Sequence, residues 1–256
     1  MKSSEMKICG LAAVRARFKR DASSIVRLYF DHPTSKRVGV MCRTLAAARK
    51  VYRCVEPSEL EKIADTIHHG GIVAVVEGRP ARTPTAADAS DWARRRENVV
   101  VLDRIGNAHN LGAIARTAGY FGVPRMVISG DAASAQPGTA AYRVAEGGLE
   151  ALEIWTVAEI APFLRMLSAA GYEVVGAASR GGSSETALAR HTGPWALVLG
   201  NEERGLADDV HAACTRLVTI AAKGPVESLN VSVAAAILIH ELSRQDGRRH
   251  GSGPSH

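Results

Sequence analysis

Long apolar runs, aromatic residues and paired cysteines are scarce in this chain of 256 residues. No uninterrupted apolar run reaches the roughly 18 residues that a membrane-spanning helix requires, so no such helix is expected. The basic N-terminus has only a short apolar stretch, broken by Arg15 and Arg17, and does not predict a signal peptide. The four cysteines form no CxxC pair and are expected to be free core residues of a cytoplasmic, reduced chain: Cys9, Cys42, Cys54 and Cys214.

The usual phosphate-binding loops are also missing. The segment after Asp103, RIGNAHNLGAI, contains neither GxGxxG nor GxxxxGK[ST], which disfavours a nucleotide-dependent α/β enzyme. Aromatic residues are only 5% of the chain and hydrophobic residues 46%, with much of the apolar content Ala and Val. This composition favours close packing of helices against strands in a sizeable core.

Positive charge is concentrated at the front of the chain. Residues 1–77 hold 14 Lys and Arg against 8 Asp and Glu, whereas residues 98–246 hold 11 against 15. Such asymmetry is typical of a front module that meets a polyanion. On charge alone, a solvated basic surface that binds no partner is an equally good interpretation.

The chain divides into two modules and two irregular segments. Residues 78–97 are rich in Pro, Ala, Thr, Asp and Arg and lack periodicity, which predicts a linker between modules at 1–77 and 98–246. The Gly/Ser/His-rich end, 247–256, is expected to be disordered.

Both modules alternate helical and strand patterns. In the second module, apolar strands are predicted at 98–103, 125–129, 152–157, 173–179, 195–200 and 216–221. Helices are predicted between and after them, at 111–121, 158–170, 207–213 and 230–243. Continuous apolar strands between helices indicate a mostly parallel sheet covered on both faces. The first module is predicted to be a small α/β domain, with helices at 9–20, at 35–50 and from Pro57, and strands at 25–30, 51–55 and 72–77.

Two unusual polar residues follow the first strand of the second module, in NVVVLDRIGNAHNLGAIARTAGYFGV. Asn110 precedes the apolar helix and is expected to cap it, whatever else it does. Arg116 lies on a helix otherwise built mostly from Gly, Ala, Leu, Ile and Thr, so its guanidinium needs an anion or several acceptors. A structural ion pair is the alternative to a functional anion.

Two further segments place polar residues after strands. In WALVLGNEERGL a buried strand ends at Gly200 and Glu202 follows, at the kind of edge where open α/β sheets bind ligands. In RLVTIAAKGPVESLNVSVAAAILIHEL, Ser228, Asn230 and Ser232 open a helix that is apolar nearly all round and therefore expected to be buried. They are expected to form the polar floor of a pocket, although Ser228 as a plain helix cap stays open.

Together the three segments resemble, in order and spacing, the motifs of the SpoU/TrmH family of RNA ribose 2′-O-methyltransferases. The resemblance covers the whole second module. The first module resembles the small substrate-binding domain of these enzymes, with the turn at His69 and Gly70 as its closing motif. The overall character is similar to the YfiF-like branch.

This resemblance implies an α/β fold with a C-terminal trefoil knot, an L30e-like first domain, a homodimer, S-adenosylmethionine as cofactor and an RNA substrate, ribosomal or transfer. It implies that Gly200, Ile220 and Leu229 hold the cofactor through their backbone. It implies a polar active-site set of Asn110, Arg116, Glu202, Ser228 and Asn230. Many relatives have Pro-Met where this chain has Ala221 and Ala222, and the smaller residues predict a looser cofactor loop.

Several alternatives remain open at this stage. Arg116 as general base is chemically awkward because guanidinium is hardly ever deprotonated, so a role in phosphate binding and charge stabilisation is preferred. A non-catalytic RNA-binding protein that kept the fold is the rival function. A metal site at His68, His69 and Cys54 matches no zinc spacing.

Overall fold

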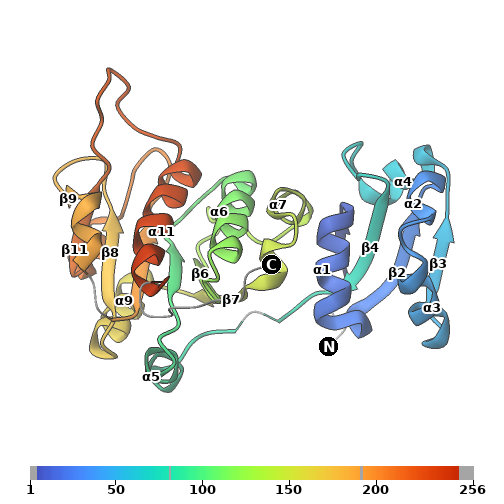
Figure 1. Ribbon diagram of the computed structural model, residues 1–256, viewed down its shortest axis with the longest axis horizontal. Helices are drawn as coiled ribbons and strands as arrows, with labels where there is room; N and C mark the ends of the chain where they lie inside the picture. The colour runs from blue at the N-terminus through green and yellow to red at the C-terminus, as the bar shows by residue number, and fades with distance from the viewer. Residues whose placement is uncertain (1–4, 81, 191–192, 248–256) are drawn as a thin grey trace.

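The second module is built on a seven-stranded sheet in which every pairing is parallel (Figure 1). The computed structural model describes residues 5–80, 82–190 and 193–247. The strand order is β7-β6-β5-β10-β8-β11-β9. The strands are β5 (Val99–Leu102), β6 (Arg125–Ser129), β7 (Glu153–Val157), β8 (Glu173–Ala177), β9 (Ser183–Ser184), β10 (Trp195–Leu199) and β11 (Arg216–Thr219). The predicted parallel sheet and its six long strands are therefore confirmed.

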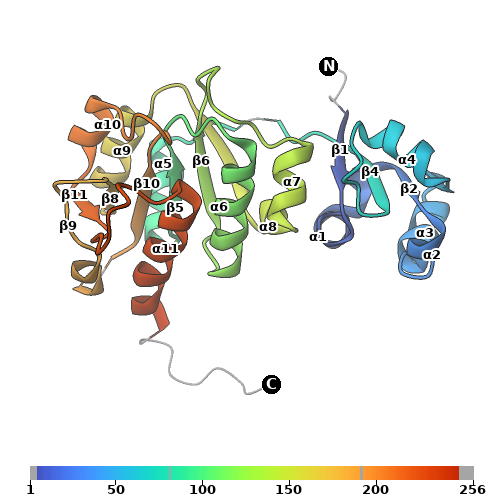
Figure 2. The same ribbon diagram turned by 90° about the horizontal axis from the view of Figure 1, so that it is seen from above.

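Helices cover both faces of this sheet (Figure 2). One face carries α6 (Ala108–Tyr120), α7 (Thr139–Ala145), α8 (Gly148–Ala151) and α11 (Val231–Gly247). The other carries α5 (Ala86–Arg94), α9 (Ile160–Ala169) and α10 (Asp208–Ala213). A short 3₁₀ segment, η2 (Glu185–Arg190), contacts α11. The central strands are apolar throughout because alternate residues enter the cores on opposite faces: Val100 and Leu102 pack on one side, Val99 and Val101 on the other.

The first module has a smaller, mixed sheet of order β1-β4-β2-β3. Its elements are β1 (Glu5–Cys9), α1 (Leu11–Asp21), η1 (Ala22–Ser24), β2 (Ile25–Phe30), α2 (His32–Ser35), α3 (Gly39–Ala47), β3 (Val51–Cys54), α4 (Pro57–Ala64) and β4 (Ile72–Glu77). The predicted α/β character is confirmed. The single helix expected over 9–20 is wrong at its start, because residues 5–9 pair with β4 as an antiparallel edge strand.

The two modules meet through a buried ion pair. Arg17 on α1 and Glu150 on α8 are both buried, with Nη1 and Oε1 3.2 Å apart. Arg79 also pairs with this carboxylate, and Arg20 donates to the carbonyl oxygen of Leu152 over 2.8 Å. The hydrophobic core on the α6 face continues into the first module without interruption. The modules are therefore docked against each other and do not hang from a tether.

The segment expected to be a linker is more ordered than predicted. Residues 86–94 form α5, which begins with a capping box between Thr85 and Asp88. The sequence pattern T-x-x-D is hard to recognise as a helix start here because Pro and Arg residues surround it. Trp92 is buried at an edge-to-face distance of 5.1 Å from Trp155, and the backbone N–H of Thr156 donates to the carbonyl of Arg82. This connection is thus packed on the second sheet.

The remaining predictions concern further helices, membrane spans, the cysteines and the C-terminal tail. The helices α7 and α8 were not predicted. None of the described helices is long and apolar enough to cross a membrane. The four cysteines are free, but only Cys9 is fully buried and Cys54 is exposed, so the expectation of four core cysteines is wrong for Cys54. The predicted disordered tail lies, from residue 248 onward, outside the described residues.

Candidate active site

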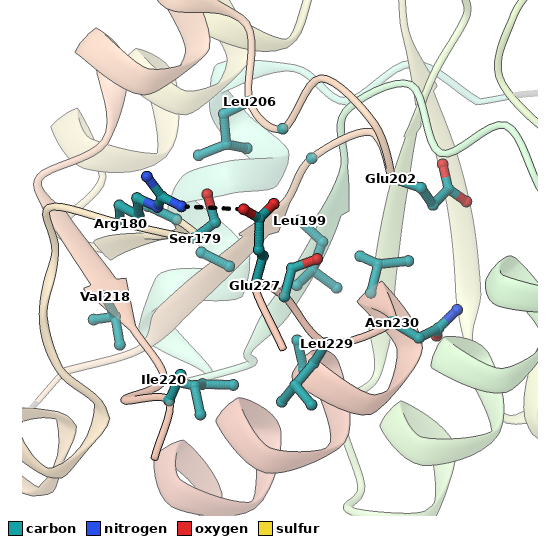
Figure 3. A pocket seen from close by; sticks show the side chains of 18 of the residues that line it. Ser179, Arg180, Leu199, Glu202, Leu206, Val218, Ile220, Glu227, Leu229 and Asn230 are labelled. Carbon is teal, nitrogen blue, oxygen red and sulfur yellow. Dashed lines mark ion pairs between the residues drawn. The ribbon is translucent and has the colours of Figure 1, made fainter. Parts of the chain in front are cut away.

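A large cavity opens at the carboxyl ends of the central strands β8, β10 and β11. It measures about 960 Å³, within the range usual for small-molecule sites. Figure 3 shows the apolar side chains of Leu199 and Leu229 between polar groups on either side. Gly200, Glu202, Ser228 and Asn230 also line it. Six of the eight residues expected to form the site therefore border one cavity: Gly200, Glu202, Ile220, Ser228, Leu229 and Asn230.

A chain of hydrogen bonds joins the three sequence motifs at this cavity. The Asn110 side-chain amide donates to Glu202 Oε1 over 2.8 Å, and Asn230 Nδ2 donates to Asn110 Oδ1 over 3.1 Å. The partners are 92 and 120 residues apart in sequence. Asn110 is buried and does not itself line the cavity. It links Glu202 and Asn230 and fixes the orientation of both.

Glu202 is held as a carboxylate. Partial burial acts to raise its pKa, but hydrogen bonds from the Asn110 side chain and from the backbone amides of Gly106 and Asn107 outweigh burial, and the net pKa is lowered. Oε1 accepts from Asn110 and Asn107, whereas Oε2 accepts from Gly106 at 3.3 Å. Oε2 therefore keeps acceptor capacity for a ligand hydroxyl.

The expected caps are shifted along the chain. Helix α6 is capped by Asn107, whose side chain accepts from the backbone N–H of His109, so the expectation that Asn110 caps it is wrong. At α11, Asn230 Oδ1 accepts from the backbone N–H of Ser232 over 2.9 Å. Asn230 thus caps the helix in place of Ser228. The freed Asn110 side chain, on the first turn of α6, is what reaches Glu202.

Two residues that the sequence did not single out support the loops around Glu202. Asp103 is buried and its Oδ2 accepts from the backbone N–H of Ala207 over 2.9 Å. Asn201 donates to the carbonyl of Arg104 over 2.9 Å and accepts from the amides of Glu203 and Arg204. Asp103 directly follows β5 and Asn201 lies two residues after the end of β10, and these positions after buried strands were the available signal for them.

Gly200 has a structural reason of its own. A Cβ at this position would collide with the backbone of Gly205 and Leu206. The loop 201–205 folds back tightly, with a bridge between Asn201 and Gly205. The close approach that the glycine allows is thus made by its own chain, at a position that also lines the cavity.

Arg116 lies apart from the hydrogen-bonded cluster. Six residues, or about 1.7 helical turns, separate it from Asn110, so the two side chains leave α6 in different directions. Its side chain is 57% exposed, and the guanidinium pairs with Glu146 at 2.9 Å. This ion pair, with an exposed carboxylate at the end of α7, is the alternative that the sequence left open to a functional anion, and Arg116 does not border the cavity.

Apolar side chains are also exposed on α6 and on α11, two helices that pack against each other (Figure 2). Tyr120 is 84% exposed and Val233 is 47% exposed. The Tyr120 ring lies 5.2 Å from that of Phe121, which lies 5.8 Å from that of His240. The expectation that α11 is buried nearly all round is therefore wrong for this side of the helix.

The cavity suits a cofactor with an apolar ring system and a charged tail. Leu199, Val218 and Ile220 form an apolar wall, while charged side chains stand at the opening. Ala221 and Ala222 are exposed, and the Ala221 amide donates to Glu185 over 3.4 Å. Among the described residues, no group of three or more His, Cys, Asp and Glu side chains is placed to hold a metal ion.

Two family profiles match the chain, and it is similar to curated relatives and to solved structures. The profile of the SpoU rRNA Methylase family matches residues 97–240, and the profile described as RNA 2'-O ribose methyltransferase substrate binding matches residues 7–81. The chain is 34% identical to the uncharacterized tRNA/rRNA methyltransferase YfiF of Escherichia coli O157:H7, over 96% of this chain and 70% of the relative. It is 33% identical to the 23S rRNA (guanosine-2'-O-)-methyltransferase RlmB of Nitrosomonas europaea, over 96% and 94%. It is similar to the SpoU methyltransferase AviRb of Streptomyces viridochromogenes solved with AdoMet, with a TM-score of 0.76 and 25% identity over 95% and 91%.

Proposed function

This chain belongs to the SpoU rRNA methylase family, and on that premise we propose that it transfers the methyl group of S-adenosylmethionine to a ribose 2′-hydroxyl in ribosomal or transfer RNA. One observation carries the proposal. The hydrogen-bonded chain of Glu202, Asn110 and Asn230 brings all three sequence motifs to one edge of a cavity of cofactor size.

Three residues are proposed to hold the cofactor: Gly200, Ile220 and Leu229, all of which border the cavity. When bound, S-adenosylmethionine supplies a methyl group activated by its positively charged sulfur. Leu199 and Ile220 would form the apolar wall of the cofactor site and would exclude water from it. Ala221 and Ala222 leave this wall open to solvent, which makes the loop the weakest part of the cofactor site.

Glu202, Asn110 and Asn230 are proposed to orient the ribose. The free acceptor capacity of Glu202 Oε2 suits the ribose hydroxyls, and Ser228 at the cavity edge shapes the same space. A lowered pKa makes Glu202 a weak base, so its contribution is alignment of the reacting groups. The hydroxyl proton then leaves to a phosphate or to water.

Arg116 is proposed to grip a phosphate near the reacting ribose and to stabilise the developing negative charge on oxygen. Its exposed position and single exposed partner, Glu146, leave the guanidinium open to a phosphate at little cost. A general-base role would need strong desolvation, which an exposed guanidinium lacks.

A homodimer is proposed to cover the exposed apolar and aromatic residues of α6 and α11. Tyr120, Val233 and His240 present apolar and aromatic surface there, on the helix that also carries Arg116 or on its neighbour. A second copy docked against Tyr120 would place Arg116, about one helical turn away on α6, at the edge of the interface. Size-exclusion chromatography with light scattering tests the dimer, and Tyr120→Glu should convert it to a monomer.

The first module is proposed to bind RNA, as the matched substrate-binding profile and its excess of basic residues support. An L30e-like topology for this module and a trefoil knot at the C-terminal end are proposals from the family resemblance. The return of α11 from the outlying strand β11 to pack on α6 supports the knot. A cytoplasmic location is proposed from the RNA substrate.

The decisive experiment pairs two measurements on the purified chain. Isothermal titration calorimetry should detect binding of S-adenosylmethionine. Transfer of labelled methyl groups to 23S and 16S ribosomal RNA and to transfer RNA, with mass-spectrometric detection of 2′-O-methylated nucleosides, should then identify the substrate. RNA binding without cofactor binding or transfer would favour the rival function, an RNA-binding protein that kept the fold.

A further inference from the structure

The cavity contains a second charged group, on the side away from Glu202. Arg180 follows β8 and Glu227 precedes α11, and Nη2 of one lies 3.8 Å from Oε1 of the other (Figure 3). In this view Leu199 and Leu229 stand between this pair and the polar side chains of Glu202 and Asn230. The cavity thus has two polar ends with an apolar middle.

The pair is weakly held. The two side chains are 82% and 86% exposed, and at 3.8 Å the contact is at the outer limit of an ion pair. Exposed pairs of this kind contribute little to stability, so a ligand can separate them at small cost. Both side chains border the cavity, so a ligand bound there can reach the two of them.

The other charged residues at the cavity do not offer this combination. The cavity is also bordered by Arg204, His211, Lys223 and Glu203. Within the described part of the chain, the pair of Arg180 and Glu227 is the only ion pair that joins two cavity-lining side chains. It places a cation and an anion side by side.

Such an arrangement is complementary to an α-amino acid, which carries a carboxylate and an ammonium on the same carbon. We propose that Arg180 and Glu227 bind the amino-acid end of S-adenosylmethionine, with the guanidinium on the carboxylate and the Glu227 carboxylate on the ammonium. The inference rests on the proposed function and extends it to two residues outside the expected site. Arginine suits this role because its planar fork can donate two parallel hydrogen bonds to a carboxylate.

The test compares two ligands that differ by one group. S-adenosylmethionine carries both charges, whereas its decarboxylated form keeps the ammonium and the sulfonium but lacks the carboxylate. Calorimetry should show that Arg180→Gln weakens S-adenosylmethionine about tenfold and leaves the decarboxylated ligand unchanged, because only the former loses a charge-assisted hydrogen bond. Glu227→Gln should weaken both ligands, since both carry the ammonium.

Arg204→Gln is the matched control. It removes a guanidinium from the same cavity, on the loop after β10, and should leave the ratio of the two affinities at its wild-type value. Melting curves by circular dichroism should show that the three variants fold like the wild type.

The outcomes separate this inference from the proposed function. If the wild type binds S-adenosylmethionine and Arg180→Gln keeps the wild-type ratio, the assignment of Arg180 is wrong while the methyltransferase proposal stands. A change of ratio in Arg204→Gln alone would also overturn it and move the carboxylate subsite to the β10 loop. If the wild type binds neither ligand, the proposed function itself fails.

Discussion

The two modules share an α/β architecture but use charge in opposite ways. The first has 14 basic against 8 acidic residues, and one edge of its sheet is β3, whose four residues are all exposed. The second has 11 against 15, and it holds Glu202 and Glu150 in specific hydrogen bonds or ion pairs. Cations spread over a surface attract polyanions whatever their shape. Carboxylates held in one orientation instead favour a small ligand of defined geometry.

At the junction between the modules, the two kinds of charge meet in a buried ion pair. Arg17 of the basic module is buried against Glu150 of the acidic one, with Glu150 also paired to Arg79. The two modules also share one hydrophobic core, although one is basic and the other acidic. Removing the first module would expose this carboxylate and the surrounding apolar surface, so its role is better tested by substitution than by deletion.

The largest effect is expected at Arg116, a cation of the net acidic second module to which we assign a role in methyl transfer. Arg116→Ala should lower methyl transfer by about a hundredfold or more, as expected for loss of a charge that stabilises the transition state. The dissociation constant of S-adenosylmethionine should stay close to the wild-type value, because Arg116 does not border the cavity.

Arg116→Lys separates charge from the planar fork, and Glu146→Ala removes only the exposed partner. We expect partial activity from the first and nearly full activity from the second. Turnover close to wild type in Arg116→Ala would rule out the assigned role.

The next effect concerns the junction. Glu150→Ala should lower the free energy of unfolding by about 3–5 kcal/mol, because it leaves the buried Arg17 guanidinium without its carboxylate. Urea denaturation measures this loss. Glu5→Ala, which removes an exposed pair with Arg27, should cost about 1 kcal/mol or less.

A double variant sharpens the junction test. Replacing both partners, in Arg17→Met with Glu150→Leu, should recover part of the stability lost in Glu150→Ala, since a buried pair is often replaceable by apolar residues. Equal stability of Glu150→Ala and the wild type would show that the modules are not held together by this contact.

A smaller effect is expected from the surface cations of the first module. The triple substitution of Arg43, Arg49 and Arg53 by Gln should weaken RNA binding and flatten its dependence on salt, by about 0.7–0.9 in log–log slope for each phosphate that the protein no longer neutralises. Fluorescence anisotropy over a range of KCl concentrations measures both quantities.

The control lies outside the first module. Arg94 and Arg95 on α5 are exposed and paired with Asp91, and their substitution by Gln should change the slope little. If the two variants behaved alike, net charge and not the first module would determine RNA binding.

The smallest effect is the pH dependence of Glu202. Because its pKa is lowered on folding, the charged carboxylate stabilises the folded state fully above the ordinary Glu range and loses this contribution as pH falls through the lowered pKa. The melting temperature of wild type should therefore exceed that of Glu202→Gln near pH 7 and approach it in acid. A difference between the two proteins that did not vary with pH would contradict this origin.

The sequence predicted individual elements well and the joins between them less well. The strands at 25–30, 72–77 and 125–129 match in full, because a buried strand is a local apolar run. Helix α5 and the strand β1 were missed, since each is stabilised mainly by what it packs against: Trp155 for α5 and β4 for β1. The caps were misplaced by three residues at α6, where Asn107 and Asn110 are equally plausible from composition.

The sequence predicted which residues gather at the candidate site but not how they are arranged. Six of its eight expected residues border the cavity, and Asn110 joins them through Glu202. Arg116, from the same helix as Asn110, stands on another face beside Glu146. Arg180 was not singled out, although the end of a predicted strand at 179 indicated that its neighbours would lie at the same sheet edge.

By itself, the sequence determined the two α/β modules, the parallel sheet and the three motifs, because periodicity and composition record which face of each element is buried. Only the tertiary structure decided that Glu202, Asn110 and Asn230 meet, that Arg116 stands apart, and that Arg180 faces Glu227. The physical reason is that such contacts depend on the order of strands in the sheet and on the turn of each helix relative to its neighbours. Neither quantity is written in the local pattern of any one segment.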